Sequence, residues 1–181
     1  NHGVHVFDAH SGTLILSLVG RGTKAGSFNL PRDVAVDRRG RIHVVDGGNF
    51  RVQIFKPDGA FERSFGAVGR QSGMFSRPKE LALDTESRIY VVDAAFGNMQ
   101  IFDSGGRLLM DIGGRSNTDR PGKFMLPSGI AVDDDGRVYM IDQYFRKIDV
   151  FRPVSLPVTA GYLGHFADTS AERRRARQVS Q

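Results

Sequence analysis

Residues 28–55 hold the pattern that decides the fold. They begin with Phe28-Asn-Leu-Pro31-Arg-Asp-Val-Ala-Val-Asp37, continue with Gly40-Arg-Ile-His-Val-Val-Asp46, and end on Asn49-Phe-Arg-Val-Gln-Ile-Phe55. Each segment contains a short run of apolar and β-branched residues, and residues that favour turns separate the runs. This pattern indicates short β-strands joined by tight turns.

The same pattern returns twice further along the chain. Pro78-Lys-Glu-Leu-Ala-Leu-Asp84 and Pro127-Ser-Gly-Ile-Ala-Val-Asp133 both match the first run. Four phenylalanines that close a copy are 48, 47 and 49 residues apart: Phe7, Phe55, Phe102 and Phe151. A fixed period of this size is typical of a repeat protein. Residues 1–20 match only the tail of the repeat, so the sequence opens inside a unit.

Each complete unit predicts four strands. In the first unit these are residues 33–37, 41–46, 51–55 and 60–65. The first strand is nearly all apolar, so we expect it to be buried on both faces. Turns such as Asp37-Arg-Arg-Gly40 supply residues that tolerate a positive φ. A four-stranded antiparallel meander of about 45 residues has the size of a propeller blade.

These residues resemble the NHL repeat. The shared pattern is Pro-x-x-[Ile/Val/Leu]-Ala-[Val/Leu]-Asp, a turn, an apolar strand ending in Asp, and a strand ending in Phe, over roughly residues 1–152. The resemblance implies an all-β fold of the β-propeller type, with about three and a half blades present from a ring that most often has six. Three departures affect only loops: Ser87 replaces a turn glycine, Phe96-Gly97 inserts a residue, and Arg146 takes an asparagine position.

The repeat divides the chain into blades. We assign residues 1–20 to the last strands of a partial blade, 21–66 and 67–113 to two blades, 114–166 to a blade with a C-terminal extension, and 167–181 to a basic tail, flexible or a short helix. Residues 158–166 could add one strand. Because three and a half blades leave apolar faces open, we expect the remaining blades to come from a longer chain, which we favour, or from a second copy.

Composition excludes several classes of protein. The chain is 40% hydrophobic and 25% charged, and no apolar run approaches the ~18 residues of a membrane span. Cysteine is absent, which excludes disulfides, Cys-based zinc sites and covalent haem within this chain. The net charge is +5, but without residues 169–181, with four arginines and one glutamate, it is +2. We expect a bacterial periplasmic or extracellular location, and a cytoplasmic one stays open.

The repeated aspartates form two series. Asp37, Asp84 and Asp133 follow the first strands, and Asp46, Asp93 and Asp142 end the second strands. Paired carboxylates can bind cations or act as acid and base. Residues at equivalent positions of every blade more often hold turns, so we interpret both series as structural.

We find no catalytic or metal site in the sequence. It holds no nucleophile elbow, phosphate-binding loop or zinc-binding helix. The spacing of His2, His5 and His10 suggests a metal, but a turn between them would scatter the rings. His43 replaces Tyr90 and Tyr139 of the other copies, which favours a packing role. We therefore expect no cofactor in this chain and favour a non-enzymatic role, with enzyme activity left undecided.

Three loops leading into the first strands vary while the blade does not. They are residues 20–27, 66–73 and 113–122, and each carries Arg or Lys among glycines. Equivalent loops of a propeller lie on one face, so they predict a positive surface for an anionic partner. The candidate residues are Arg21, Lys24, Arg32, Arg70, Lys79 and Arg115. Plain solvated connections are the alternative interpretation of these loops.

The preferred function is a protein-binding or scaffold module that acts through this loop face. One alternative is an RNA-binding propeller, for which Phe50, Phe96, Tyr144 and Phe145 could stack bases. The low charge of the folded part disfavours that alternative. A second alternative, implied by the family resemblance, is part of a lyase-like enzyme with a metal in the channel of the propeller.

Overall fold

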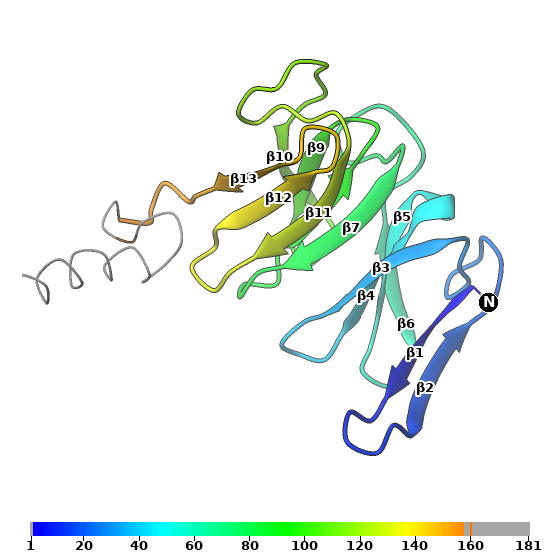
Figure 1. Ribbon diagram of the computed structural model, residues 1–181. Coiled ribbons are helices and arrows are strands. Elements are labelled where there is room, and N and C mark those ends of the chain that lie inside the picture. The colour runs from blue at the N-terminus through cyan, green and yellow to red at the C-terminus, as the bar shows by residue number, and fades with distance from the viewer. Residues whose placement is uncertain (1, 158–159, 161–181) are drawn as a thin grey trace, which may run out of the picture.

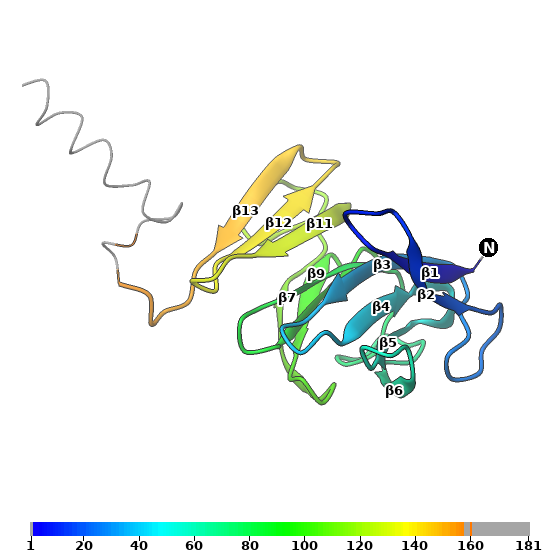
Figure 2. The same ribbon diagram turned by 90° about the horizontal axis from the view of Figure 1, so that it is seen from below.

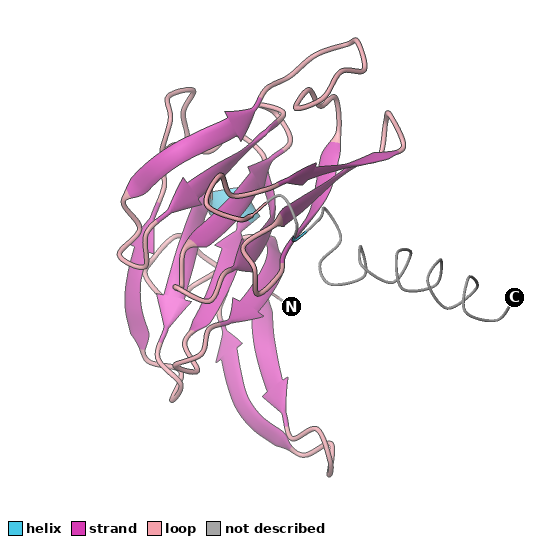
Figure 3. Cartoon of the chain, turned by 90° about the vertical axis from the view of Figure 1, so that its left-hand side faces the viewer, coloured by secondary structure: helices cyan, strands magenta, loops and turns pink. Residues whose placement is uncertain are grey.

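The structure is a computed structural model that describes residues 2–157 and residue 160. Its regular elements in this part of the chain are β-strands, apart from a short 3-10 helix, η1 (Gly47–Asn49), as Figure 3 shows. None of the described residues forms a helix long and apolar enough to cross a membrane. The predicted all-β class is confirmed.

The strands form four antiparallel sheets. The first sheet pairs β1 (Gly3–Phe7) with β2 (Leu14–Val19). The second contains, in order, β3 (Pro31–Val36), β4 (Ile42–Asp46), β5 (Arg51–Phe55) and β6 (Phe61–Phe65). The third contains β7 (Pro78–Leu83), β8 (Ile89–Asp93), β9 (Asn98–Phe102) and β10 (Leu108–Gly113). The fourth contains β11 (Pro127–Val132), β12 (Val138–Asp142) and β13 (Lys147–Phe151).

The sheets follow one another along an arc (Figures 1 and 2). The first strands β3, β7 and β11 are neighbours on its inner side, and β6 and β10 lie at the outer edges of their sheets. Radially arranged meanders with the first strand innermost are the blades of a β-propeller. The fold is therefore the predicted propeller type, seen as an arc of two four-stranded blades between a two-stranded and a three-stranded one.

Three apolar clusters lie between successive sheets. The first joins Leu18 to Phe28, Ile42, Val44 and Phe55. The second and third repeat it around Phe75 and Phe124, and each of the three phenylalanines is fully buried. Because each sheet presents one face to each neighbour, burial of apolar area between blades is the main force that holds the arc together.

Turn chemistry explains where the first strands end. Gly40 and Gly136 adopt left-handed backbone conformations with φ of 76° and 78°, which glycine reaches without steric cost. Ser87 takes the same position with φ of 62°. Ser87 therefore occupies the position of the turn glycine, as the sequence predicted, and it adopts the same left-handed backbone conformation although it has a Cβ atom.

Two expectations about the loops after the second strands were wrong. Asp46 pairs with Arg51, Asp93 with Asn98, and Asp142 with Lys147, so all three loops have the same length and Phe96-Gly97 is no insertion. The residue before each third strand is left-handed in all three loops: Phe50, Gly97 and Arg146. Arg146 thus matches Phe50, not an asparagine. In the third sheet, β9 begins at Asn98, which is equivalent to Arg51 of β5. The sequence comparison had aligned Asn98 with Asn49, two residues earlier in the repeat.

The expectation that the first strand is buried on both faces was also wrong for β3. Its residues alternate, and Val34 and Val36 are 46% and 61% exposed because the first sheet has no inner strands beside them. The three-stranded sheet shows no fourth strand within the described residues. The strand expected within residues 158–166 falls almost wholly outside the described part, as does the tail at residues 167–181.

Candidate functional site

The first strands give the arc two different faces. The loop face contains the loops at residues 20–27, 66–73 and 113–122 together with the starts of β3, β7 and β11. The turn face contains the turns at residues 37–41, 84–88 and 133–137, where these strands end. β3, β7 and β11 run in the same direction relative to the axis of the arc. The three loops that precede them therefore lie on one face, and the three turns that follow them lie on the other (Figure 1).

Each loop is anchored by the middle residue of the third strand in the blade that it enters. Gln53 Oε1 accepts a hydrogen bond from the Gly26 amide at 3.0 Å. Gln100 Oε1 accepts one from the Gly73 amide at 2.6 Å, and its Nε2 donates to the Met74 carbonyl at 2.8 Å. The fourth sheet uses a carboxylate for the same task, since Asp149 Oδ2 accepts from the Gly122 amide at 2.8 Å. The loops therefore have fixed backbones.

A basic residue at the start of the third strand adds a second anchor in two blades. Arg51 donates to the carbonyls of Thr23, Lys24 and Ser27 at 2.8–2.9 Å. Lys147 donates to the Arg120 carbonyl at 2.7 Å and pairs with Asp119 at 3.0 Å. Burial opposes the charge of Lys147, but hydrogen bonds to Asp119 and Asp149 outweigh it and raise the pKa of Lys147.

Most of the predicted cations of the loop face are exposed. Arg21, Lys24, Arg32 and Arg70 are exposed, and within the described part of the chain their side chains make no hydrogen bond or ion pair. Lys79 is half-buried, and its charge acts on Glu80. Arg115 donates to the Ala94 carbonyl at 3.2 Å, so this guanidinium also supports the fold. Arg21 and Lys24 lie on one loop, Arg70 and Arg115 lie on the other two, and Arg32 and Lys79 lie at the starts of β3 and β7 on the same face.

Charge separates the two faces. The segments 20–32, 66–79 and 113–128 of the loop face contain nine Lys or Arg and one acid, Asp119. The turns at 37–41, 84–88 and 133–137 contain five Arg and six Asp or Glu. The turn-face charges largely neutralise one another, whereas the loop face keeps a positive excess that can attract an anionic surface.

The first aspartate series holds the turns, as predicted. Asp37 Oδ1 accepts from the Arg41 amide at 2.9 Å, and its Oδ2 accepts from Arg41 Nε at 2.7 Å. Asp84 and Asp133 repeat this arrangement with the arginine four residues on. Burial opposes ionisation of Asp37, but these hydrogen bonds outweigh it, so the pKa of Asp37 lies below its ordinary value.

A ring from the second strand completes each turn network. Tyr90 and Tyr139 donate to Asp84 and Asp133, both at 3.0 Å, and His43 Nε2 lies 3.3 Å from Asp37 Oδ2. Burial, and then the charge of Asp84, raises the pKa of Tyr90 to about 12. Burial lowers the pKa of His43, although Asp37 opposes that shift. His43 therefore substitutes for a tyrosine in packing, as the sequence indicated.

The second aspartate series orders the starts of the first strands. Asp93 Oδ2 accepts from the amides of Ser76 and Arg77 at 2.7 and 2.9 Å. Asp46 and Asp142 accept from the equivalent amides before β3 and β11. These carboxylates are fully buried. Backbone amides satisfy Asp93 and Asp142, and Asp46 also accepts from the side chains of Asn49, Arg51 and Gln53, which confirms the structural role of the series.

Carboxylates that link neighbouring blades were missed in the sequence. Asp33 Oδ2 accepts from the Leu81 amide of the next blade at 2.8 Å. Glu80, at the equivalent position, accepts from the Ile130 amide of the blade after that. Burial, and then the charge of Asp33, raises the pKa of Glu80. The signal was an acid two residues after the proline in two of the three copies, and the third copy has Gly129 there.

The aromatic residues considered for base stacking are mostly not available. Phe50 packs against the cluster between the second and third sheets, and Phe96 is half-buried. Phe145 is half-buried, with Lys147 Nζ 5.7 Å from its ring centroid. Tyr144 is 61% exposed. One exposed ring out of four candidates gives little support to single-stranded RNA binding.

The histidines of the first sheet have separate partners. His2 Nδ1 accepts from the Leu30 amide at 2.9 Å, and His5 Nδ1 lies 3.0 Å from Ser17 Oγ. Among the residues that the structure describes, no three His, Asp or Glu side chains are grouped so that they could hold a metal ion.

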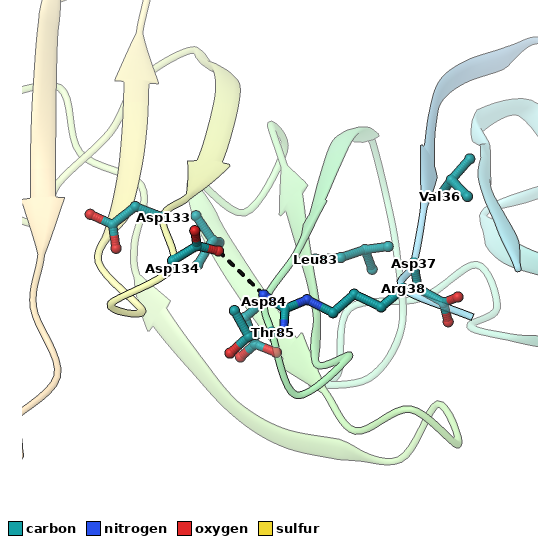
Figure 4. Close-up of a pocket in the computed structure, with 9 residues that line it drawn as sticks. Val36, Asp37, Arg38, Leu83, Asp84, Thr85, Asp133 and Asp134 are labelled. Carbon is teal, nitrogen blue, oxygen red and sulfur yellow. Dashed lines mark hydrogen bonds and ion pairs between the residues drawn. The ribbon is translucent and has the colours of Figure 1, made fainter. Parts of the chain in front are cut away.

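A small cavity lies on the turn face where three turns converge. It has a volume of about 120 Å³ and is lined by residues 36–38, 83–85 and 132–134 (Figure 4). Arg38 reaches from the second sheet to Asp134 of the fourth at 3.5 Å, and both side chains are well exposed. The three aspartates that line the cavity each form an ion pair with the arginine four residues on: Asp37 with Arg41, Asp84 with Arg88 and Asp133 with Arg137. The cavity therefore offers few unpaired groups to a ligand.

Comparison with known proteins agrees with this geometry. The family model described as NHL repeat matches residues 28–55, so the NHL resemblance of the repeat is confirmed. A comparison with curated proteins gave no significant match.

Solved structures resemble the fold at low sequence identity. A streptogramin B lyase gives a TM-score of 0.53 at 14% identity, with 80% of this chain and 46% of that chain covered. Virginiamycin B lyase from Staphylococcus aureus gives 0.55 at 14% identity, with 85% and 50% covered. A protein of unknown function from Bacteroides thetaiotaomicron gives 0.65 at 16% identity, with 83% and 43% covered. This chain thus spans about half the length of these structures, and the likeness shows the fold alone.

Proposed function

We propose that this NHL-repeat propeller module binds an acidic surface of a partner protein through its loop face. The observation that carries the proposal is the charge difference between the compared segments, nine cations with one acid in segments 20–32, 66–79 and 113–128 of the loop face against five with six in the turns at 37–41, 84–88 and 133–137. Positive side chains on one face raise the rate of encounter with a negatively charged partner and select against positive ones.

The anchored loops support the same function. Because Gln53, Gln100 and Asp149 fix the loop backbones, little loop entropy is lost when a partner docks. Arg21 and Arg70 project from these fixed loops without a hydrogen bond or ion pair to any described residue. Exposed, unpaired cations on a rigid frame are suited to binding carboxylates of another protein.

The test compares matched charge reversals on the two faces. One variant carries Arg21→Glu and Arg70→Glu on the loop face, and the control carries Arg39→Glu and Lys56→Glu, two exposed cations in turns on the other side. Proteins captured from extract of the source organism are quantified for wild type and both variants. We expect acidic partners to be lost about tenfold or more from the loop-face variant only, since removing charges that face a partner slows association.

Two results would contradict the proposal. Equal capture by both variants would show that the loop face makes no contribution. The second result is salt-dependent binding of labelled single-stranded RNA that is stronger than the capture of any protein. If the loop-face variant lost this binding, the loop face would be assigned to nucleic acid instead.

A further inference from the structure

His43 is a buried histidine with one ring nitrogen that has no partner. Its side chain is fully buried in β4, between the second and third sheets. Val45 of β4 and Ile54, which pairs with His43 across to β5, lie on the same face and belong to the apolar cluster shared with the third sheet. His43 Nε2 lies 3.3 Å from Asp37 Oδ2, and Nδ1 makes no hydrogen bond to any residue that the structure describes. Buried polar atoms without a partner are rare in folded proteins.

The charges that act most on His43 come from its own sheet. They are Asp37 in the turn before β4, Arg41 at the end of that turn, and Glu62 of β6. Arg41 Nε donates to Asp37 Oδ2 at 2.7 Å, and Arg41 Nη1 lies 3.5 Å from Glu62 Oε1. Each acid is therefore already paired with Arg41, and the partly shared Asp37 Oδ2 is the acceptor that remains for the histidine ring.

The position of the proton on His43 follows from this neighbour. Burial opposes ionisation of Asp37, but its hydrogen bonds outweigh burial and hold its pKa below the ordinary value. The carboxylate is therefore ionised and only accepts, so Nε2 carries the proton of the neutral ring and Nδ1 is bare. A second proton would create a buried N–H donor without an acceptor. Burial accordingly lowers the pKa of His43, although Asp37 opposes that shift.

The other two copies of this turn hold a different ring. Tyr90 and Tyr139 occupy the equivalent position and donate a hydroxyl to Asp84 and Asp133, which leaves no bare ring nitrogen. Burial, and then the charge of Asp84, raises the pKa of Tyr90 to about 12, so this ring does not titrate near neutral pH. Of the three turns, the one at residues 37–41 is tied to the side chain whose ordinary pKa is about 6.5.

We propose that His43 makes the turn at residues 37–41 a switch that opens in mild acid. Because the proton on Nδ1 has no acceptor in the closed turn, protonation favours an open turn in which water reaches the ring. The closed turn binds this proton more weakly than the open one. Its stability is therefore fully present above about pH 6.5 and is lost as the pH falls toward the lowered pKa of the closed state.

The switch acts on the cavity of the turn face. Arg38 lies in the same turn, and its guanidinium pairs with Asp134 of the fourth sheet at 3.5 Å (Figure 4). Both residues line the small cavity where the three turns converge. Opening of residues 37–41 would release Arg38 from Asp134 and widen this cavity, while the loop face on the opposite side would stay unchanged.

The experiment follows hydrogen exchange of the full chain between about pH 7.5 and about pH 5, on both sides of the ordinary histidine pKa. Exchange in the turn 37–41 is divided by exchange in the turn 133–137 of the same sample, so that the general effect of pH on exchange cancels. His43→Tyr introduces the ring of the other copies. Tyr90→His transfers the histidine to the turn 84–88. The remaining histidines are present in every variant, so a difference reports the exchanged ring.

We expect the ratio for wild type to rise by up to about tenfold for each pH unit below about 6.5, as linkage requires for one proton. The ratio should stay constant in His43→Tyr, and the turn 84–88 should gain an acid response in Tyr90→His. A constant ratio in wild type, or an equal rise in His43→Tyr, would overturn the proposal. If His43→Tyr does not fold, Tyr90→His decides the question, and the absence of an acid response at residues 84–88 would then overturn it.

Discussion

The two interior blades and the two end blades carry the same sequence pattern and differ in burial. Phe55 and Phe102 close the third strands of the interior blades and are 2% and 1% exposed, whereas Phe7 in the same position of the first sheet is 57% exposed. Val45 is fully buried, and its equivalent Ile141 in the fourth sheet is 42% exposed. The repeat thus encodes two apolar faces, and the presence of a neighbouring sheet decides which of them is buried.

The largest predicted effect is a loss of stability specific to the interior. Phe102 packs against Phe65 and Phe75 with ring centroids 4.6 and 5.7 Å apart. Phe102→Ala should lower the free energy of unfolding by about 3–5 kcal/mol, because it leaves a cavity in a packed cluster. Phe7→Ala should cost less than about 1 kcal/mol, since that ring is mostly in water. Chemical denaturation measures both, and equal losses would contradict the comparison.

A second prediction compares an interior loop anchor with an end anchor. Gln100 is fully buried, and Gln100→Leu should cost about 2 kcal/mol because it leaves the Gly73 amide and the Met74 carbonyl unsatisfied. Asp149→Leu should cost about 1 kcal/mol, since its site is partly open to water that can replace the lost acceptor. Hydrogen exchange should rise in residues 66–73 for the first variant and in 113–122 for the second. An unchanged loop 66–73 would contradict the anchoring role of Gln100.

The smallest predicted effect concerns the turn that differs among the blades. Ser87 has φ of 62°, where Gly40 and Gly136 stand in the other two copies. Ser87→Gly should raise the free energy of unfolding by about 0.5–1 kcal/mol, because glycine has no Cβ atom to strain in the left-handed region. Gly136→Ser is the reciprocal control and should lower it by a similar amount. Thermal melts of both variants check the sign, and destabilisation by Ser87→Gly would contradict it.

Much of the fold could be predicted because it is local. Strand runs, turn glycines and the aspartates that hold the turns recur at a fixed spacing, and each acts within a few residues of itself. The wrong register at Asn98 came from matching residue types where the strand pairing matches positions. Phe50, Gly97 and Arg146 share the left-handed backbone conformation although they are three different residue types. The residue type at this position therefore could not show how the repeats align.

The candidate site was predictable in outline and not in detail. A shared loop face follows from the repeat; Arg21 and Arg70 are exposed there, and their role in binding a partner stays a prediction. The hydrogen bond from Arg115 to the Ala94 carbonyl and the anchoring by Gln100 join residues about 20 to 27 positions apart. The Arg115 contact joins neighbouring blades, and the Gln100 contacts join a loop to the third strand of the same blade, so both depend on tertiary packing that no local pattern reveals.

The sequence by itself determined the repeat, its strands, its turns and the charge excess of the loops, because these follow from the order of residues within one 48-residue unit. Tertiary structure alone decided that Val34 is exposed while Leu81 is buried, and that Asp33 bonds to the backbone of the next blade. Burial and pairing require a partner surface, and here that surface comes from a neighbouring unit of the chain.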